Sequence, residues 1–292
     1  MRLALALVER GREAVVINAD SAQVYADLAV LSARPTPDEM REIEHRLFGT
    51  WDAAKACSAA DWAAEARTVI AEVHARGAVP ILVGGTGLYL RTLLDGIAPV
   101  PPIAPDIRQN VRAMPVAEAY SALQRRDPAR AALLAAGDTS RISRALEVVL
   151  STGRPLADWQ GELVDGIAAS VTIHPAVLLP PRDWVYERCD RRFAQMLEHG
   201  AVAEVEALLA RQLDPELPAM RAIGVSEVSA LLAGQATHSQ TEVRGAQATR
   251  NYAKRQFTWL RNQMPNNWPR WEQINFDEYG TFVPLLRDNA LT

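Results

Sequence analysis

The stretch VPILVGGTGLYL, residues 79–90, runs from a short apolar segment straight into a glycine-rich turn. Its first five residues form a continuous apolar run, which is typical of a strand buried on both faces. A second run of this kind, AVVI at residues 14–17, comes earlier in the chain. The segment 58–76 lies between the two runs, has apolar residues at helical spacing, and opens with the capping-box pair Ser58 and Asp61. Strand, helix and strand in this order predict an α/β fold with a parallel sheet.

The residues before the first strand predict a helix. The chain opens with MRLALALVER, residues 1–10, whose alanines and leucines are strong helix formers. Gly11 is a typical residue at which such a helix ends. The apolar run is too short for a secretory segment, and no small-residue cleavage site follows it. A chain that opens inside a helix, without a cap, leads us to expect a further segment upstream of Met1.

A proline-rich segment predicts a domain boundary. Residues 98–106 read APVPPIAPD and contain four prolines, which fix their own backbone and disfavour helix in the residue before them. The chain after this segment is helical in pattern and rich in Ala, Arg and Leu. We therefore expect a core formed by residues 1–104 and 169–292, with residues 105–168 as a smaller helical insertion domain.

The second half of the core is mostly helical in pattern. Residues 171–179 are apolar at most positions and predict a strand that returns to the sheet. From Arg182 almost to Met264 the spacing is helical. Breaks are expected at Gly200, at residues 214–218 and near Gly234.

Composition excludes several classes of protein. Of 292 residues, 49% are hydrophobic and 23% are charged, which rules out a disordered or collagen-like chain. No apolar run approaches the ~18 residues that a membrane span needs. The net charge of −4 means that any nucleic-acid site must be a local basic patch. Cys57 and Cys189 lie far apart and outside any metal-ligand spacing, so a reduced, cytoplasmic protein is expected.

Polar side chains follow both predicted strands. Residues 18–25 (NADSAQVY) follow the first strand, and residues 84–89 (GGTGLY) follow the second. Ligands of open α/β sheets bind outside the carboxyl ends of strands, so both turns are expected to face one crevice. A carboxylate there can accept a proton, and glycines let a ligand approach the backbone. The alternatives are that Asp20 or Ser21 only caps a helix and that the glycines only form a tight turn.

A basic, aromatic-rich segment spans residues 244–270. It contains no acidic residue, and its aromatic side chains are interleaved with cations. Such segregation in an otherwise acidic protein indicates contacts with phosphate groups, although a solvated charged face explains it about equally well. The cations are Arg244, Arg250, Lys254, Arg255, Arg261 and Arg270.

A second basic pair lies in the predicted insertion domain. Arg141 and Arg144 are one helical turn apart and share one side of their helix. Base edges and phosphates are both suitable targets, and a salt link to Asp138 or Glu147 is the alternative.

Taken together, these stretches resemble the tRNA dimethylallyltransferases, also called tRNA isopentenyltransferases. The matching motifs follow the family's order and cover nearly the whole chain. They are INADSAQVY (17–25), SAADW (58–62), VPILVGGTGLYL (79–90), SRISRALEV (140–148), TGRPL (152–156), LPPRDWVYERCDRRFAQML (179–197), LPAMRAIG (217–224) and ATRNYAKRQFTWLR (248–261).

The resemblance implies both a fold and an activity. The fold would be a P-loop-NTPase-like parallel sheet flanked by helices. Proteins with this fold are associated with nucleotide binding, so ATP binding is also expected. The activity would transfer a dimethylallyl group from dimethylallyl diphosphate to the exocyclic amino nitrogen of the adenosine 3′ of the anticodon in tRNA. Asp20 matches the family's general base and Thr86 its channel threonine. Mg²⁺ would neutralise the leaving diphosphate, and the protein would be a monomer.

The resemblance also assigns binding residues. Arg182, Arg188 and Arg192 are candidates for the diphosphate, with salt links to Asp183, Glu187 and Asp190 as an equally good interpretation. The residues assigned to tRNA are Asp20, Ser21, Ala22, Gln23, Thr86, Arg108, Ser140, Arg141, Ile142, Ser143, Arg144, Arg221, Arg250, Lys254 and Arg255.

The chain departs from the family pattern at three places. The Walker-type loop G-x-x-x-x-G-K-S/T is absent from the sequence, and Met1 stands where that loop would just have ended. We expect a start codon assigned too late, or else a truncated tRNA-binding remnant without catalysis. A P-loop nucleotide kinase is a weaker alternative. Ser140 replaces a family glutamine, and Val225 with Ser226 replaces a Tyr-Arg pair, which alters the expected RNA contacts.

Overall fold

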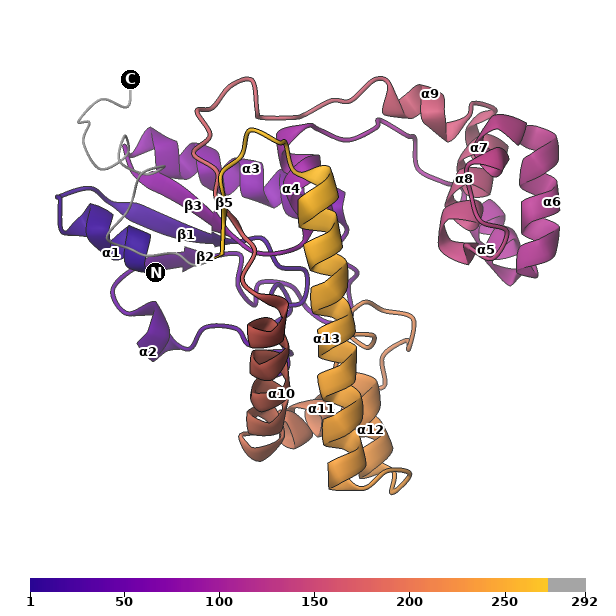
Figure 1. Cartoon of the computed structure of the whole chain (residues 1–292). Helices are drawn as coiled ribbons and strands as arrows, with labels where there is room; N and C mark the ends of the chain where they lie inside the picture. Colours follow the sequence, from indigo (N-terminus) through magenta and orange to yellow (C-terminus); the bar gives the residue numbers. More distant parts are fainter. Residues whose placement is uncertain (273–292) are drawn as a thin grey trace. The chain divides into compact units, whose positions relative to one another are not determined.

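The computed structural model describes residues 1–272 of the chain. Two compact units are present: residues 1–91 together with the chain from Val171 onward, and residues 92–170 (Figure 1). The predicted core also included residues 273–292, which lie outside the described residues. Each unit is described separately below.

The larger unit contains a three-stranded parallel sheet, as predicted. Strand β1 (Ala14–Asn18) lies between β2 (Glu44–Arg46) and β3 (Val79–Val83). All five residues of β1 are buried, which explains its continuous apolar sequence. Strand β2 was not predicted, because this edge strand is only three residues long and reads Glu-His-Arg.

Helices cover the sheet. Helix α1 (Arg2–Val8) ends before Gly11, whose φ of 73° turns the chain toward β1. Its Leu7 packs with Val16 of β1 and Val79 of β3. Helix α3 (Ala59–Ala75) has the predicted capping box and buries Trp62 completely. Two short helices, α2 (Pro37–Met40) and α4 (Gly87–Leu94), follow β1 and β3.

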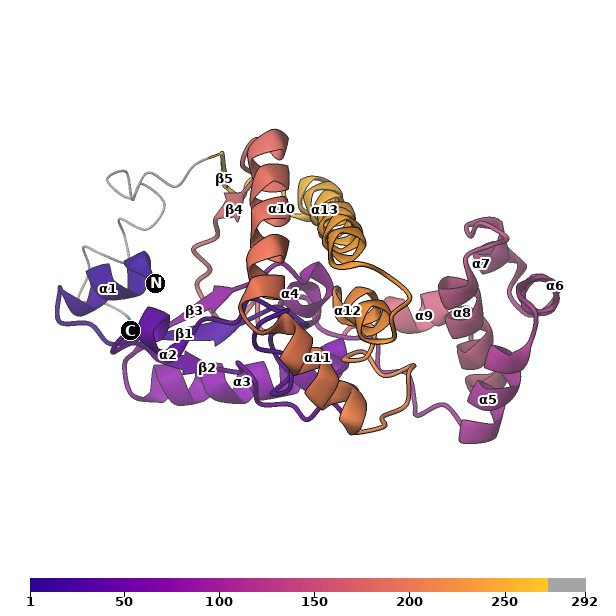
Figure 2. The same ribbon diagram turned by 90° about the horizontal axis from the view of Figure 1, so that it is seen from below.

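Four helices form the second half of this unit: α10 (Arg182–Glu198), α11 (Ala201–Ala210), α12 (Val225–Leu232) and α13 (His238–Gln263). The breaks between them fall at Gly200, between residues 211 and 224, and near Gly234, as predicted. Figures 1 and 2 both show α10 beside α13. The close approach needs glycine at position 245, since a Cβ there would lie 1.9 Å from the Phe193 ring.

The predicted strand over residues 171–179 is wrong in extent and in partner. Only Val177–Leu178 (β4) is extended, and it pairs with Arg270–Trp271 (β5) in a separate two-stranded sheet. Residues 171–176 lie outside any strand. The pairing of β4 depends on a partner more than 90 residues away in the chain, which the local apolar pattern does not reveal.

The smaller unit is helical. It contains α5 (Pro105–Ala113), α6 (Val116–Arg126), α7 (Pro128–Ala132), α8 (Thr139–Thr152) and α9 (Leu156–Gln160). Leu123, Ile142 and Leu146 are fully buried in its core.

The smaller unit begins at residue 92 rather than at the predicted residue 105. Backbone hydrogen bonds join Ile97 to Val164 in both directions, at 2.9 and 3.0 Å. Ile103 packs against Val148 and Leu156. The proline-rich segment therefore packs as part of the helical unit instead of linking it to the core. No helix in the described part of the chain is both long enough and apolar enough to cross a membrane.

Candidate active site

A buried asparagine shapes the turn at the end of β1. The Asn18 side chain is fully buried, and its Oδ1 accepts a hydrogen bond from the Asp20 backbone N–H at 2.8 Å. Its amide nitrogen donates to the Asp20 and Leu47 carbonyl oxygens, both at 3.0 Å. The Trp62 indole donates to the Asn18 carbonyl at 2.9 Å. These bonds fix the direction in which the chain leaves the strand and presents Asp20.

The Asp20 carboxylate is partly withdrawn from water. Its Oδ1 accepts a hydrogen bond from the Ala22 backbone N–H at 2.8 Å. Burial raises the pKa of Asp20 above its ordinary value, while hydrogen bonds from the Ala22 and Gln23 backbones oppose part of that rise. The alternative that Asp20 caps a helix is wrong, because residues 21–24 form turns and the next helix begins at Pro37.

Thr86 joins the second turn to the first. Its Oγ1 accepts a hydrogen bond from the Ser21 backbone N–H at 2.9 Å and lies 3.2 Å from the Ser21 hydroxyl. The Thr86 backbone N–H also donates to the Ala19 carbonyl at 3.2 Å. The two turns therefore meet at one edge of the sheet, as the sequence predicted.

The glycines of the second turn make room for protein. A Cβ at Gly84 would lie 2.2 Å from the backbone of Ala19. A Cβ at Gly85 would meet the Gln256 amide at 2.3 Å, and one at Gly87 would meet the Trp259 ring at 2.2 Å. Both of these side chains belong to α13. The absence of side chains at Gly85 and Gly87 thus allows α13 to pack on the turn.

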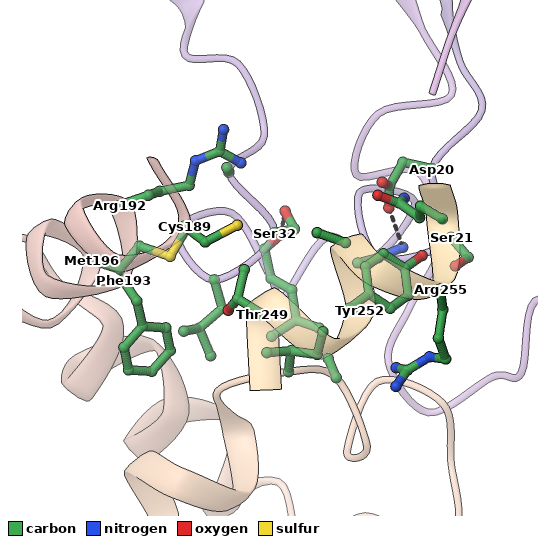
Figure 3. A pocket seen from close by; sticks show the side chains of 18 of the residues that line it. Asp20, Ser21, Ser32, Cys189, Arg192, Phe193, Met196, Thr249, Tyr252 and Arg255 are labelled. Atoms are coloured by element: carbon green, nitrogen blue, oxygen red, sulfur yellow. Dashed lines mark hydrogen bonds between the residues drawn. The ribbon is translucent and has the colours of Figure 1, made fainter. Parts of the chain in front are cut away.

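Asp20 lies at a cavity of about 520 Å³ (Figure 3). The loop after β1, helices α10 and α13, and the segment 218–223 supply its walls. Leu31, Phe193 and Met196 are among its apolar residues. The charged residues at the cavity are Asp20, Arg188, Arg192, Arg221 and Arg255. One carboxylate thus shares a largely apolar cavity with several arginines.

Tyr252 of α13 also lines this cavity, although no sequence motif singled it out. Burial raises the pKa of its hydroxyl, and the nearby Asp20 charge raises it further, while hydrogen bonding with Thr86 and Gln256 opposes the rise. The Arg255 guanidinium lies 5.5 Å from the centre of the Tyr252 ring. The aromatic residues interleaved in the basic segment were the available signal, but they did not indicate which ring faces Asp20.

Two of the three arginines assigned to the diphosphate line the cavity. Neither Arg188 nor Arg192 forms an ion pair with any residue of 1–272. Arg188 lies 4.7 Å from the Trp184 ring centre. Arg182 is exposed on the first turn of α10 and is not among the cavity residues.

The salt links expected for these arginines are formed by other cations. Glu187 pairs with Arg191 at 3.2 Å, and Asp190 pairs with Arg250. The interpretation of Arg188 and Arg192 as internal salt links is therefore wrong for the described residues. Arg250 is neutralised by α10, a partner that the local sequence of the basic segment could not reveal.

The other cations of the basic segment have different surroundings. Arg270 donates to backbone carbonyls, including those of Met264 and Asn266, and so closes the turn after α13. Lys254 and Arg255 are exposed, and neither is ion-paired within residues 1–272. Arg221, which lies outside this segment, is exposed and pairs with Glu216 at 3.3 Å.

Gln23 serves the loop that carries Asp20. Its side-chain amide donates to the carbonyl oxygens of Ser32 at 3.0 Å and Ala33 at 3.1 Å. These donors are therefore engaged within the protein, which argues against the predicted contact of the Gln23 amide with tRNA. Ala22 lines the cavity beside Asp20.

The remaining predicted contacts lie in the smaller unit. Ile142 is fully buried there, so its side chain belongs to the core and cannot contact RNA, contrary to the prediction. Arg141 is exposed and pairs with Asp138 at 3.1 Å, the alternative considered from the sequence. Ser140 is exposed and Ser143 is half-buried.

Arg144 and Arg108 are exposed cations of the smaller unit. Partial desolvation lowers the pKa of Arg144, Glu147 opposes this, and the charges of Arg108 and Arg112 lower it further. Arg112 is the residue that pairs with the buried Glu147, at 3.0 Å. A cluster of cations is thus present around Arg144 and is only partly neutralised.

Comparisons with known proteins agree with this arrangement. Residues 23–263 match the family model described as IPP transferase. The chain is 60% identical over 280 residues to the tRNA dimethylallyltransferase of Novosphingobium aromaticivorans, covering 96% of this chain and 100% of that protein. It is 61% identical to the tRNA dimethylallyltransferase of Erythrobacter litoralis, covering 98% and 90% of the two chains.

Solved structures give the same result. The tRNA isopentenylpyrophosphate transferase of Bacillus halodurans is 28% identical with a TM-score of 0.66, over 97% of this chain and 91% of that one. A eukaryotic dimethylallyltransferase acting on tRNA is 26% identical with a TM-score of 0.74, over 89% and 66%. The predicted P-loop-NTPase-like α/β fold class is confirmed by these matches. The chain belongs to the IPP transferase family.

Burial of Asp20 predicts a pH-dependent effect on stability. Because the pKa is higher in the folded state, the charged carboxylate disfavours folding at neutral pH. Asp20→Asn removes the charge and keeps an oxygen for the Ala22 amide, so we expect a higher Tm than that of the unmutated chain at pH 7. The difference should shrink as the pH falls toward 3.8, the ordinary aspartate value, below which the group is protonated in both states. Thermal unfolding followed by circular dichroism measures it, and a variant less stable at pH 7 would contradict the burial argument.

Proposed function

We propose that this chain transfers a dimethylallyl group from dimethylallyl diphosphate to the exocyclic amino nitrogen of the adenosine 3′ of the anticodon in tRNA. Relatives at 57–61% identity are named tRNA dimethylallyltransferases. These relatives favour the enzyme over the non-catalytic remnant and over the nucleotide kinase. The observation that carries the chemistry is a partly desolvated carboxylate, Asp20, at a cavity that also holds free arginines.

Asp20 acts as the general base in this proposal. The adenine amino nitrogen attacks C1 of the dimethylallyl group, and the bond between C1 and the diphosphate oxygen breaks. The electron pair of that bond leaves with the diphosphate, and the amino proton passes to the Asp20 carboxylate. Burial strengthens this base, because the charged form is disfavoured until it takes up the proton. A base within a duplex or stacked loop has to be extruded to reach such a cavity.

Thr86 and Tyr252 are assigned supporting roles next to Asp20. The Thr86 hydroxyl fixes the turn that follows Asp20 through the Ser21 N–H. Tyr252 lines the cavity, and aromatic rings are the usual stacking partners of extruded bases. We assign Tyr252 to the acceptor adenine on these grounds.

Arg188 and Arg192 are assigned to the diphosphate. Free guanidinium groups donate strong, charge-assisted hydrogen bonds to phosphate oxygens. Mg²⁺, which the resemblance implies on the diphosphate, stays a prediction, because no group of three or more His, Cys, Asp or Glu side chains within residues 1–272 could hold a metal ion. Arg182 is less suited to the donor, since it lies outside the cavity.

The tRNA backbone is assigned to exposed cations on each unit. Lys254 and Arg255 supply them on the larger unit, and Arg108 and Arg144 supply them on the smaller one. Such contacts position the RNA without reading its sequence. ATP binding, a monomeric state and a cytoplasmic location stay predictions.

Asp20→Asn is expected to lower the rate of transfer by about 10²–10⁴-fold, because it removes the general base and keeps the shape of the side chain. Binding of tRNA should be roughly unchanged. The rate is measured as transfer of radiolabelled dimethylallyl groups to bulk tRNA under single-turnover conditions. The affinity for tRNA is measured by filter binding. A variant with the unmutated rate would show that Asp20 is not the base.

The pair Arg188→Ala and Arg192→Ala is expected to raise the KM for dimethylallyl diphosphate by about 10–100-fold, the loss typical of charge-assisted hydrogen bonds. The KM for tRNA should change little. Arg191→Ala is the matched control, because Arg191 lies on the same helix and pairs with Glu187. A larger effect on the KM for tRNA than on that for the donor would assign the two arginines to RNA.

The pair Lys254→Ala and Arg255→Ala is expected to weaken tRNA binding and to flatten its salt dependence. Removing two phosphate contacts should reduce the slope of log K against log salt concentration by about 1–2. Titrations at several salt concentrations measure this slope. An unchanged slope would return these side chains to the solvated face considered from the sequence.

A further inference from the structure

Glu204 of α11 holds the loop that follows Asp20. Its Oε1 accepts hydrogen bonds from the backbone N–H groups of Ala29 at 2.5 Å and Val30 at 2.7 Å. Its Oε2 accepts a third from Leu31 at 2.9 Å. Three successive amides thus converge on one carboxylate from a helix more than 170 residues away in sequence.

A second anchor lies at the end of the same helix. Arg211 pairs with Asp27 and, at 2.6 Å, with Asp52. The other oxygen of Asp27 accepts a hydrogen bond from the Ala53 N–H at 3.1 Å. Both ends of α11 are therefore bonded to the segment between β1 and α3.

A continuous path of bonds connects Glu204 to the Asp20 carboxylate. The amides that Glu204 binds are followed at once by Ser32 and Ala33, whose carbonyl oxygens accept hydrogen bonds from the Gln23 side chain. The residue before Gln23 is Ala22, whose backbone N–H donates to the Asp20 carboxylate at 2.8 Å. Each link is a hydrogen bond or a direct chain neighbour, so a shift of residues 29–31 is transmitted to the donors that hold Asp20.

Packing joins the same loop to the opposite wall of the cavity. A Cβ at Gly224 would lie 2.6 Å from Leu31 and 3.2 Å from Phe193 of α10. Leu31, Phe193 and Arg192 all line the cavity. Glu204 therefore fixes one wall of the cavity against the helix that carries Arg188 and Arg192.

We propose that Glu204 is a positioning residue for the transfer reaction: by binding the amides of residues 29–31 it fixes the loop that orients the Asp20 carboxylate. This inference rests on the proposed function. Glu204 touches neither the cavity nor any reacting atom, so its effect must pass through Asp20. Loss of the anchor loosens the backbone donors to Asp20, and loss of those donors raises the pKa of a carboxylate.

Several titratable and charged groups surround Asp20 and Glu204, and the substitutions described below leave all of them in place. Tyr252 and Arg255 face the cavity from α13, and Arg188, Arg192 and Cys189 face it from α10. Tyr25, Cys57 and Tyr89 lie on the sheet side. Burial chiefly raises the pKa of Tyr89, and the charge of Asp20 adds a smaller contribution. Asp27, Asp52 and Arg211 are the charged groups at the α11 anchors.

Glu204→Gln is the test variant, because it keeps the shape of the side chain but loses its charge and one acceptor. We expect kcat to fall by about 10–100-fold, the cost of a misplacement near 1 Å. The acid limb of the pH profile of kcat should move to higher pH, and both KM values should stay close to those of the unmutated chain. Gln23→Ala breaks the next link in the path and should move the acid limb in the same direction.

The matched control is Glu206→Ala. Glu206 lies on the same helix, is exposed, and makes no bond to the loop. Hydrogen exchange of the amides of residues 29–31 measures how firmly Glu204 holds the loop, and it does not depend on catalytic activity. Exchange should speed up in Glu204→Gln and stay unchanged in Glu206→Ala. The proposal is overturned if exchange speeds up while kcat and the acid limb match those of Glu206→Ala, or if exchange does not change.

Failure of the proposed function gives a different result. If the unmutated chain shows no transfer, the reaction assignment fails, and the Asp20 carboxyl is then titrated by NMR in the unmutated chain and in both variants. A higher pKa of Asp20 in Glu204→Gln and Gln23→Ala supports the positioning role. An unshifted pKa refutes it.

Discussion

The structure around the site depends on one constraint: the Asp20 carboxylate is held partly out of water at the end of the buried strand β1. Burial of Asp20 costs free energy, because its charged form loses hydration. The hydrogen bond from the Ala22 backbone offsets part of that cost and fixes the orientation of the carboxylate. Asn18, itself fully buried and hydrogen-bonded, ensures that the chain leaves β1 in the one direction that makes those bonds possible.

The second requirement is a helix that closes the site. Helix α13 packs onto the turn after β3 because Gly85 and Gly87 leave space for Gln256 and Trp259. This packing brings Tyr252 beside Asp20 and Thr86. A short glycine-rich turn after a strand thus joins residues that are more than 160 positions apart in the chain.

The arrangement of charge follows the same logic. Acidic residues of α10 neutralise two cations that are not among the cavity residues, Arg191 and Arg250. Arg188 and Arg192 keep their charge free at the cavity, opposite a single carboxylate. Among the described residues that line the cavity, Asp20 is thus the single carboxylate beside four arginines, a balance of charge that suits an anion.

Much of this arrangement could be predicted from local sequence. The apolar runs of β1 and β3 and the capping box of α3 have strong local signals, and so do the polar turns that bear Asp20 and Thr86. Edge strand β2 could not be predicted, because its three polar residues are extended only through pairing with β1.

Long-range contacts account for the other differences. The start of the smaller unit at residue 92 depends on the pairing of Ile97 with Val164. The roles of Gln23 and Arg250 depend on partners that lie outside their own segments. The role of Glu204 could not be predicted for the same reason. Nothing in the sequence of α11 indicates that this carboxylate binds three backbone amides of the loop that follows β1.

The central claim is that Asp20 faces the amino group of the acceptor adenine. The most direct measurement is a crystal structure of this chain with an anticodon stem-loop RNA and an unreactive thiodiphosphate analogue of the donor. We expect the adenine amino nitrogen to lie within hydrogen-bonding distance of the Asp20 carboxylate, with the diphosphate bound to the guanidinium groups of Arg188 and Arg192. An adenine bound outside the cavity, with its amino group directed away from Asp20, would contradict it.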